Sequence, residues 1–184
     1  MTANPFAPPA ATVADVEQSS AEETPTPFFA VSTNKLLVMS ICTLGLYQVY
    51  WFYKHWQHIR RREQSRLSPA PRALFSILFC YPCFRRIRNF DAPGLGKTKL
   101  AAGPLAAGWI ITTLLQLPDP YWLVSLFAPA FLVPVQALAN RKNAAVSPDH
   151  DPNDRFSVGN WIFIAFGSVL LAAAVFETMA LRLR

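Results

Sequence analysis

A Cys-x-x-Cys motif is the part of this sequence whose residue types and spacing could do chemistry. Cys80 and Cys83 flank a Tyr-Pro pair and have the spacing of dithiol redox sites and of many zinc sites. His55 and His58 lie one helical turn apart earlier in the chain. Two imidazoles and two thiolates together would complete a tetrahedral zinc site. These four residues are therefore the candidate metal ligands.

A structural interpretation of the same motif competes with both chemical ones. A redox pair needs its first cysteine at a helix N-terminus, where the helix dipole lowers the thiol pKa. Here an apolar run precedes Cys80, which places the motif toward a helix end, and burial there raises a thiol pKa. Pro82 is also a natural break in a helix. We therefore expect residues 80–83 to form a turn at a membrane face, and we expect no bound cofactor.

The elements that would hold this motif are apolar enough to lie in a membrane. Of the 184 residues, 52% are hydrophobic and 15% are charged, against roughly 25% charged residues in a soluble domain. Four nearly uncharged blocks are each long enough to cross a hydrocarbon core of about 30 Å. These blocks are 36–53, 100–117, 121–139 and 159–180. The sequence predicts an all-α membrane protein with about four transmembrane helices.

The basic residues predict how these spans are oriented. Two groups of Lys and Arg flank residues 73–84, a segment too short to span as a helix. Because basic loops stay in the cytoplasm, we expect 73–84 to be a re-entrant or interfacial segment. Both termini would then lie outside, with Lys35 also outside and Arg155 inside. Residues 1–30, which are rich in Pro, Ala and Thr and carry acids, predict a disordered tail before a helical domain at 31–184.

Aromatic and basic side chains gather where the first predicted span ends, just after a weak point of the helix at Gly45. Aromatic rings favour headgroup depth, and the Lys and Arg side chains beyond them meet anionic phosphates. The first interpretation is an interface belt that sets the depth of the helix. The second is a specific site for lipid headgroups or a partner protein. The candidate binding residues are Tyr50, Trp51, Lys54, Trp56, Arg60, Arg61, Arg62, Arg85, Arg86 and Arg88.

The stretch TLGLYQVYWFYKHW, residues 43–56, resembles a signature of small uncharacterised bacterial membrane proteins, TLGLYxxYWFYKxW. The stretches VSTNKLLVMS before it and RALFSILFCYPCFRRIRNF after it are similar to the same family, so the resemblance covers roughly residues 28–90. It implies a multi-pass protein of the bacterial inner membrane. It assigns no catalytic residue, because no activity is established for the family.

The function that these observations favour is a non-enzymatic one. A basic-aromatic cytoplasmic face without a catalytic constellation indicates an accessory or scaffolding role, in contact with anionic membrane lipids or a partner protein, as a homo-oligomer or part of a larger membrane complex. The alternatives are a small channel or permease component and a membrane-interface redox or zinc protein that uses Cys80 and Cys83. The net charge of +6 does not predict nucleic-acid binding, because in so apolar a chain it is typical of cytoplasmic loops.

Overall fold

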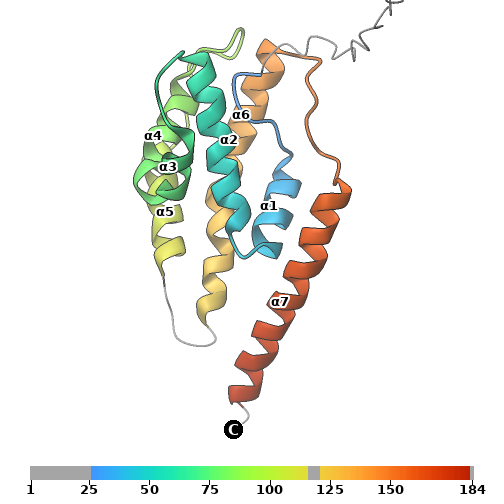
Figure 1. The fold of residues 1–184 in the computed structure, drawn as a ribbon. Helices are drawn as coiled ribbons and strands as arrows, with labels where there is room; N and C mark the ends of the chain where they lie inside the picture. Colours follow the sequence, from blue (N-terminus) through green and yellow to red (C-terminus); the bar gives the residue numbers. More distant parts are fainter. Residues whose placement is uncertain (1–25, 116–120, 183–184) are drawn as a thin grey trace, which may run out of the picture.

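The computed structural model describes residues 26–115 and 121–182, and within these ranges every regular element is a helix. The predicted all-helical fold is confirmed for this part of the chain. The elements are α1 (Thr33–Cys42), α2 (Leu46–Arg62), α3 (Pro69–Leu74), α4 (Ser76–Asn89), α5 (Ala102–Leu114), the 3-10 helix η1 (Tyr121–Phe131), α6 (Val133–Val146) and α7 (Val158–Arg182). Helices α1 to α6 form a bundle, and α7 leans against it along α1 (Figure 1).

Two helical stretches are long and apolar enough to cross a membrane, judged by length and composition. They are Trp122–Val146, in which α6 continues η1, and Val158–Ala180 within α7. Helix α5 is apolar but has only 13 residues. The predicted count of four spans is therefore not supported, because the blocks 36–53 and 100–117 contain helices that are shorter than expected.

The block 36–53 is a hairpin of two helices rather than one span. Leu44, with φ 50°, and Gly45, with φ 92°, both adopt the left-handed conformation. The amide of Gly45 donates to the carbonyl of Ser40, and the amide of Leu44 donates to the carbonyl of Ile41, a bonding pattern that ends a helix. In Figure 1, α1 descends from the upper half of the molecule and α2 returns upward. This stretch therefore does not carry the chain across the molecule.

Thr43 joins the two helices of this hairpin. Its Oγ1 donates to the carbonyl oxygen of Met39 at 2.7 Å and accepts from the amide of Tyr47 at 2.9 Å. One side chain thus contacts a carbonyl in the last turn of α1, which also accepts from the amide of Thr43, and caps an amide in the first turn of α2 that has no partner within its own helix. The second helix can begin directly after the turn for this reason.

The hairpin corrects the predicted orientation of the N-terminal part of the chain. Lys35, expected outside, donates from Nζ to the carbonyl oxygen of Arg155 at 2.6 Å, although Arg155 was expected inside. Nδ1 of His58 lies 2.9 Å from the carbonyl oxygen of Thr26, near the arginines that end α2. The first described residues therefore lie at the same end of the molecule as these arginines. Helix α7 leads away from that end (Figure 1).

The last residues of the segment 1–30, which the sequence predicts to be disordered, are packed against the helices. Residues 1–25 lie outside the described residues. Phe28 and Phe29 belong to the predicted tail, yet they are 0% and 7% exposed and pack in the core. Burial of two aromatic side chains offsets the entropy that ordering this short extended segment costs.

The predicted turn at residues 80–83 is helical. Helix α4 runs from Ser76 to Asn89 with Pro82 inside it. The chain breaks earlier, between α3 and α4, at Phe75, with φ −94° and ψ 40°. Phe75 and its neighbours Leu74 and Leu78 are exposed apolar side chains. The segment 73–84 is therefore a helix joint with an apolar surface, followed by the first half of α4.

Two glycines allow helices to approach one another closely. A methyl group at Gly167 of α7 would overlap the carbonyl oxygen of Cys42 at the end of α1. A methyl group at Gly108 of α5 would overlap the ring of Phe131 in η1. Small residues at such crossings are typical of packed apolar helices, since they gain van der Waals contact from close approach.

Candidate functional site

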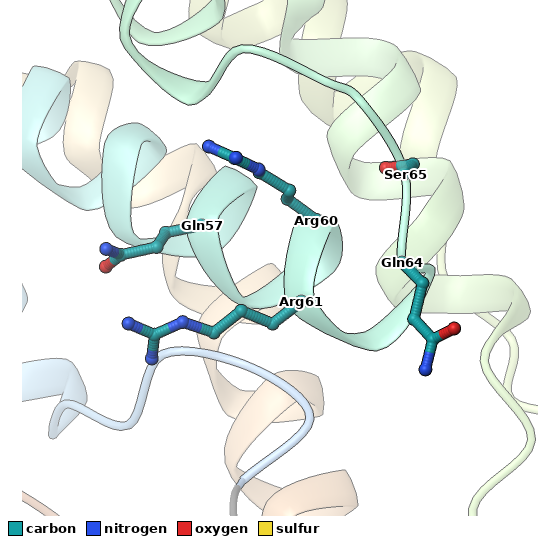
Figure 2. A pocket seen from close by; sticks show the side chains of 5 residues that line it. All are labelled: Gln57, Arg60, Arg61, Gln64 and Ser65. Carbon is teal, nitrogen blue, oxygen red and sulfur yellow. The ribbon is translucent and has the colours of Figure 1, made fainter.

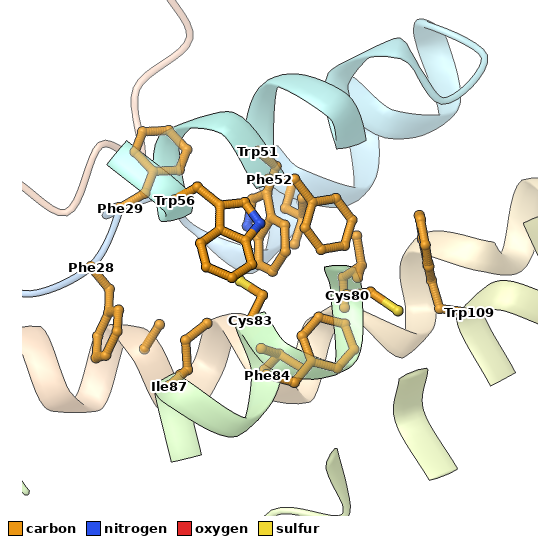
Figure 3. Close-up of a cluster of buried hydrophobic side chains, with 14 of the residues drawn as sticks. Phe28, Phe29, Trp51, Phe52, Trp56, Cys80, Cys83, Phe84, Ile87 and Trp109 are labelled. Carbon is orange, nitrogen blue, oxygen red and sulfur yellow. The ribbon is translucent and has the colours of Figure 1, made fainter. Parts of the chain in front are cut away.

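The tryptophans of the predicted site lie in the core and not at an interface. Trp51 and Trp56 are fully buried among aromatic side chains of α2, α4 and α5 (Figure 3). The guanidinium carbons of Arg72 and Arg86 lie 4.9 Å and 5.3 Å from the Trp56 ring centre and cover it from outside. Tyr50 is 46% exposed and is the aromatic member of the predicted site that faces outward. The interpretation of Trp51 and Trp56 as a membrane belt is wrong.

A buried glutamine on α6 forms hydrogen bonds with several polar groups of this core. Oε1 of Gln136 accepts from Nε1 of Trp51 at 2.6 Å and lies 3.0 Å from Nε2 of His55. Because Oε1 can only accept, Nε2 of His55 carries its proton. Complete burial lowers the pKa of His55 to about 3, so the ring is neutral. Gln136 is not among the site residues that the sequence predicts, so this role was missed.

Three amide side chains on one face of α6 hold the extended segment 26–31. Nε2 of Gln136 donates to the carbonyl of Phe29, Nδ2 of Asn140 to that of Val31, and Nδ2 of Asn143 to that of Phe28. The amide of Phe28 in turn donates to Oδ1 of Asn143. Side chains thus replace the backbone partners that a strand would have in a sheet. The signal in the sequence is the spacing of these amides, one helical turn or two apart.

Lys142 on α6 caps the end of α4. It is 1% exposed, and its Nζ donates to the carbonyls of Ile87 at 2.8 Å and Arg88 at 2.7 Å, and also to that of Phe90. An ammonium group has three donors, and all three are used. A cation at a helix C-terminus is also favoured by the helix dipole. Lys142 therefore has a structural role that the sequence did not predict.

The four candidate metal ligands do not form one site. His55 is engaged by Gln136, and His58 lies against the carbonyl of Thr26. Cys80 and Cys83 are free thiols that point from α4 into the aromatic cluster (Figure 3). Among the residues that the structure describes, no three His, Cys, Asp or Glu side chains lie close enough to share a metal ion.

The two thiols of α4 lie in apolar surroundings. Both are 0% exposed, and burial raises the pKa of each thiol above its usual value. A protonated thiol is a poor nucleophile. The arrangement therefore suits packing better than thiol–disulfide exchange.

The arginines of the predicted site divide into bound and exposed side chains. Glu63 pairs with Arg62 and with Arg86, each at 3.2 Å. Nε of Arg88 donates to Oδ1 of Asn89 at 3.0 Å. The exposed ones are Arg60, Arg61 and Arg85. We call the end of the molecule that carries these three side chains the basic end.

A polar hollow of about 470 Å³ surrounds the last turn of α2 at the basic end. Figure 2 shows Gln57, Arg60 and Arg61 reaching out from α2 on one side, with Gln64 and Ser65 following the turn. Gln64 has φ 46°, and the amide of Ser65 donates to the carbonyl of Arg60, so this helix ends as α1 does, in a left-handed turn. The turn therefore presents neighbouring guanidinium groups on a rigid helix end.

The fold and these sites define an all-helical protein with two helices that can cross a membrane and a basic end. The chain belongs to the family described as "Domain of unknown function (DUF4234)", whose model matches residues 31–127. The match includes the α1–α2 hairpin, the buried aromatic residues of α2, α4 and α5, and the segment that carries Cys80 and Cys83. No curated protein and no solved structure matches the chain.

Proposed function

We propose that this protein is a multi-pass scaffold of the bacterial inner membrane, without enzymatic activity, whose basic end contacts anionic lipid headgroups. The single observation that carries the proposal is the separation of charge from apolar surface. Arg60, Arg61 and Arg85 are exposed at the basic end, while exposed apolar side chains concentrate away from it, as at Leu46 and Phe166. In a bilayer, basic side chains are stable at the depth of the anionic headgroups, and apolar side chains are stable in the hydrocarbon core.

Two helical stretches long enough to cross, η1 with α6 and α7, support two crossings, and we infer a third at the shorter apolar helix α5 from the direction of the chain. Helix α5, η1 with α6, and α7 alternate in direction through the molecule (Figure 1). The α1–α2 hairpin and the α3–α4 joint enter the apolar layer from the basic end and return, with Leu44, Leu46 and Phe75 exposed at their tips. The basic end and the first described residues then face the cytoplasm, and α7 ends on the opposite side.

Cysteine accessibility tests this topology. Single cysteines at Ser65 and Gly96, in a variant whose native cysteines are serines, react with a membrane-impermeant maleimide only after the cytoplasmic side is opened. A cysteine appended to the C-terminus reacts in intact spheroplasts. Labelling of the appended cysteine and of Gly96→Cys from the same side would exclude three crossings.

Lipid analysis tests the contact with anionic headgroups. Each basic side chain at an anionic surface contributes about 1 kcal/mol, so Arg60→Gln, Arg61→Gln and Arg85→Gln together should strongly reduce the enrichment of anionic over zwitterionic lipid around the protein. The matched control changes the same three positions to Lys and keeps the charge. Equal enrichment in the Gln and Lys triple variants would remove the basis of the proposal.

A further inference from the structure

Two cavities meet beside the segment that α6 holds, and they differ in character. The first, which we call the basic cavity, has a volume of about 700 Å³ and is lined by Lys54, His58, Arg61 and Arg62. The second, which we call the apolar cavity, has a volume of about 670 Å³ and lies between α1, α2 and α7. Both volumes fall in the range of roughly 300–1,000 Å³ that is typical of sites for organic ligands.

The two cavities are neighbours because they share wall residues. Phe29 and Asn153 line both of them. The rings of Phe29 and Tyr50 meet edge to face at 5.8 Å, and Nζ of Lys54 lies 5.8 Å from the centre of the Tyr50 ring and 6.0 Å from that of Phe29. Lys54 therefore marks the boundary between the cavities. A ligand with a charged part and an apolar part could occupy both.

The charge of the basic cavity favours an anion. Lys54, Arg61 and Arg62 line it, and Asp151 is the acidic residue among its lining side chains. Arg62 is half-buried between the rings of Phe28 and Phe90, at 4.8 Å and 4.7 Å from their centres, which fixes its position. Guanidinium and ammonium groups in this arrangement match the oxygens of a phosphodiester.

The apolar cavity favours a hydrocarbon chain. Its walls include Leu44 and Leu46 of the α1–α2 hairpin and Phe163, Phe166 and Leu170 of α7. Phe163 and Phe166 are 58% and 65% exposed, so the cavity opens sideways along a helix that is apolar enough to cross a membrane. A chain in the surrounding bilayer can enter from that side.

A peptide fits these cavities less well, because the backbone beside them is already bonded. The carbonyls of Phe28, Phe29, Ala30 and Val31 accept hydrogen bonds from side-chain amides of α6 and from Asn153. No carbonyl of this stretch of the described chain is left for the main-chain pairing that extended peptides use. A small soluble anion would leave the apolar cavity unfilled.

We propose that the two cavities form one binding site for a single anionic glycerophospholipid of the bilayer. The phosphate lies in the basic cavity against Lys54, Arg61 and Arg62, and one acyl chain lies in the apolar cavity against α7. This inference deepens the proposed function and rests on its membrane location, but it adds a site with a stoichiometry of one lipid per chain.

Native mass spectrometry of the full chain tests this site. The protein is reconstituted in vesicles of phosphatidylglycerol and phosphatidylcholine and then transferred to a mild detergent. We expect one phosphatidylglycerol to be retained per chain, and phosphatidylcholine to be retained at least tenfold less. Equal retention of both lipids, or retention of neither, would overturn the proposal. The proposal would also be overturned if inorganic phosphate alone occupied the basic cavity and no lipid was retained.

Two matched pairs of variants locate the site. Lys54→Gln should lower retention about tenfold, because a charge-assisted hydrogen bond is lost, whereas Lys99→Gln on an exposed loop should leave it unchanged. Phe166→Ala should lower retention through the acyl chain, whereas Phe176→Ala, also exposed on α7 but outside the cavity, should not. Thermal unfolding in detergent confirms that each variant is folded. Equal effects within either pair would contradict the assigned position.

The two sets of measurements, lipid enrichment and lipid retention, distinguish a failure of this inference from a failure of the proposed function. General enrichment of anionic lipid depends on Arg60 and Arg85, which do not line the basic cavity. If Arg60→Gln with Arg85→Gln abolishes enrichment while one lipid is still retained, both statements hold. If enrichment is normal but no lipid is retained, only the single-lipid site is wrong. If one lipid is retained but these arginines have no effect on enrichment, only the proposed surface contact is wrong.

Discussion

Nε1 of Trp51 on α2 donates to Oε1 of Gln136 on α6 over 2.6 Å, across 85 residues of sequence and with both side chains fully buried. The same oxygen accepts from Nε2 of His55, and Nε2 of the same glutamine donates to the carbonyl of Phe29. One side chain therefore connects α2, α6 and the extended N-terminal segment. A buried network of this kind specifies one arrangement of its helices, because any other leaves polar groups unpaired.

Gln136→Leu should destabilise the protein by several kcal/mol. The change leaves the indole N–H, an imidazole N–H and a carbonyl without partners, and each buried unpaired group costs about 1–3 kcal/mol. The free energy of unfolding in detergent, measured by denaturant titration, checks the value. Gln57→Leu on the surface of α2 is the control and should change stability by less than about 0.5 kcal/mol. A similar loss in both variants would show that the network is not what stabilises the core.

Lys142→Met should lower stability by about 2 kcal/mol or more, because the three carbonyls at the end of α4 lose a charged donor. The adjacent exposed residue supplies the control, since Arg141→Met removes the same charge from the same helix without touching α4. Thermal unfolding of the two variants gives the comparison. If Arg141→Met is as harmful as Lys142→Met, net charge and not capping is responsible.

Gly167→Ala should separate α7 from α1, because the new methyl group overlaps the carbonyl oxygen of Cys42. Gly159→Ala on the same helix meets only Ser157 Oγ at 3.8 Å and should be neutral or stabilising by up to about 1 kcal/mol through helix propensity. Disulfide trapping between cysteines placed on α1 and α7 measures the separation. Unchanged trapping in Gly167→Ala would show that the contact is looser than the structure indicates.

Stability should fall as the pH drops from about 6.5 toward 5, in part because of His55. The pKa of His55 is about 3 in the folded protein, while that of an unfolded histidine is near 6.5. The unfolded chain therefore binds a proton in this window that the folded protein does not, which favours unfolding by up to 1.36 kcal/mol per pH unit. Above pH 6.5 neither state is protonated at this position and the contribution is constant.

His55→Gln isolates this effect. The amide can still donate to Gln136 but does not titrate, so the variant should show a shallower loss of unfolding free energy between pH 6.5 and 5. His58 remains in both proteins, and its own lowered pKa, caused mainly by burial, contributes equally to each. Parallel pH profiles for the two proteins would mean that His55 is protonated in the folded state.

Much of the helical content follows from the sequence, because apolar periodicity and Pro, Gly and polar breaks act locally. The apolar block 159–180 indicated α7, and 121–139 indicated the long stretch that the structure extends to Val146. Gly45 was recognised as a weak point in the first block. Hydropathy did not distinguish one continuous span from a helical hairpin, because both arrangements place the same apolar residues in an apolar environment. The bond from the Gly45 amide to Ser40 decides between them.

For the predicted site, local sequence patterns identified the residue types but not which side chains are buried. Sequence alone determined that aromatic and basic residues follow one another along the stretch that forms α2, and that four blocks of the chain are apolar. It did not determine that Cys80 and Cys83 lie within a helix, because Pro82 between them indicated a turn. The side of α2 that is buried was decided by α3 and α4, which pack against it, and by Gln136 of α6, which bonds to Trp51. Trp51 and Trp56 therefore became core residues, and Arg60 and Arg61 remained exposed. The partners of Gln136, Asn143 and Lys142 depend on tertiary structure for the same reason. A buried polar group must be satisfied, but which distant group satisfies it is decided only when the helices meet.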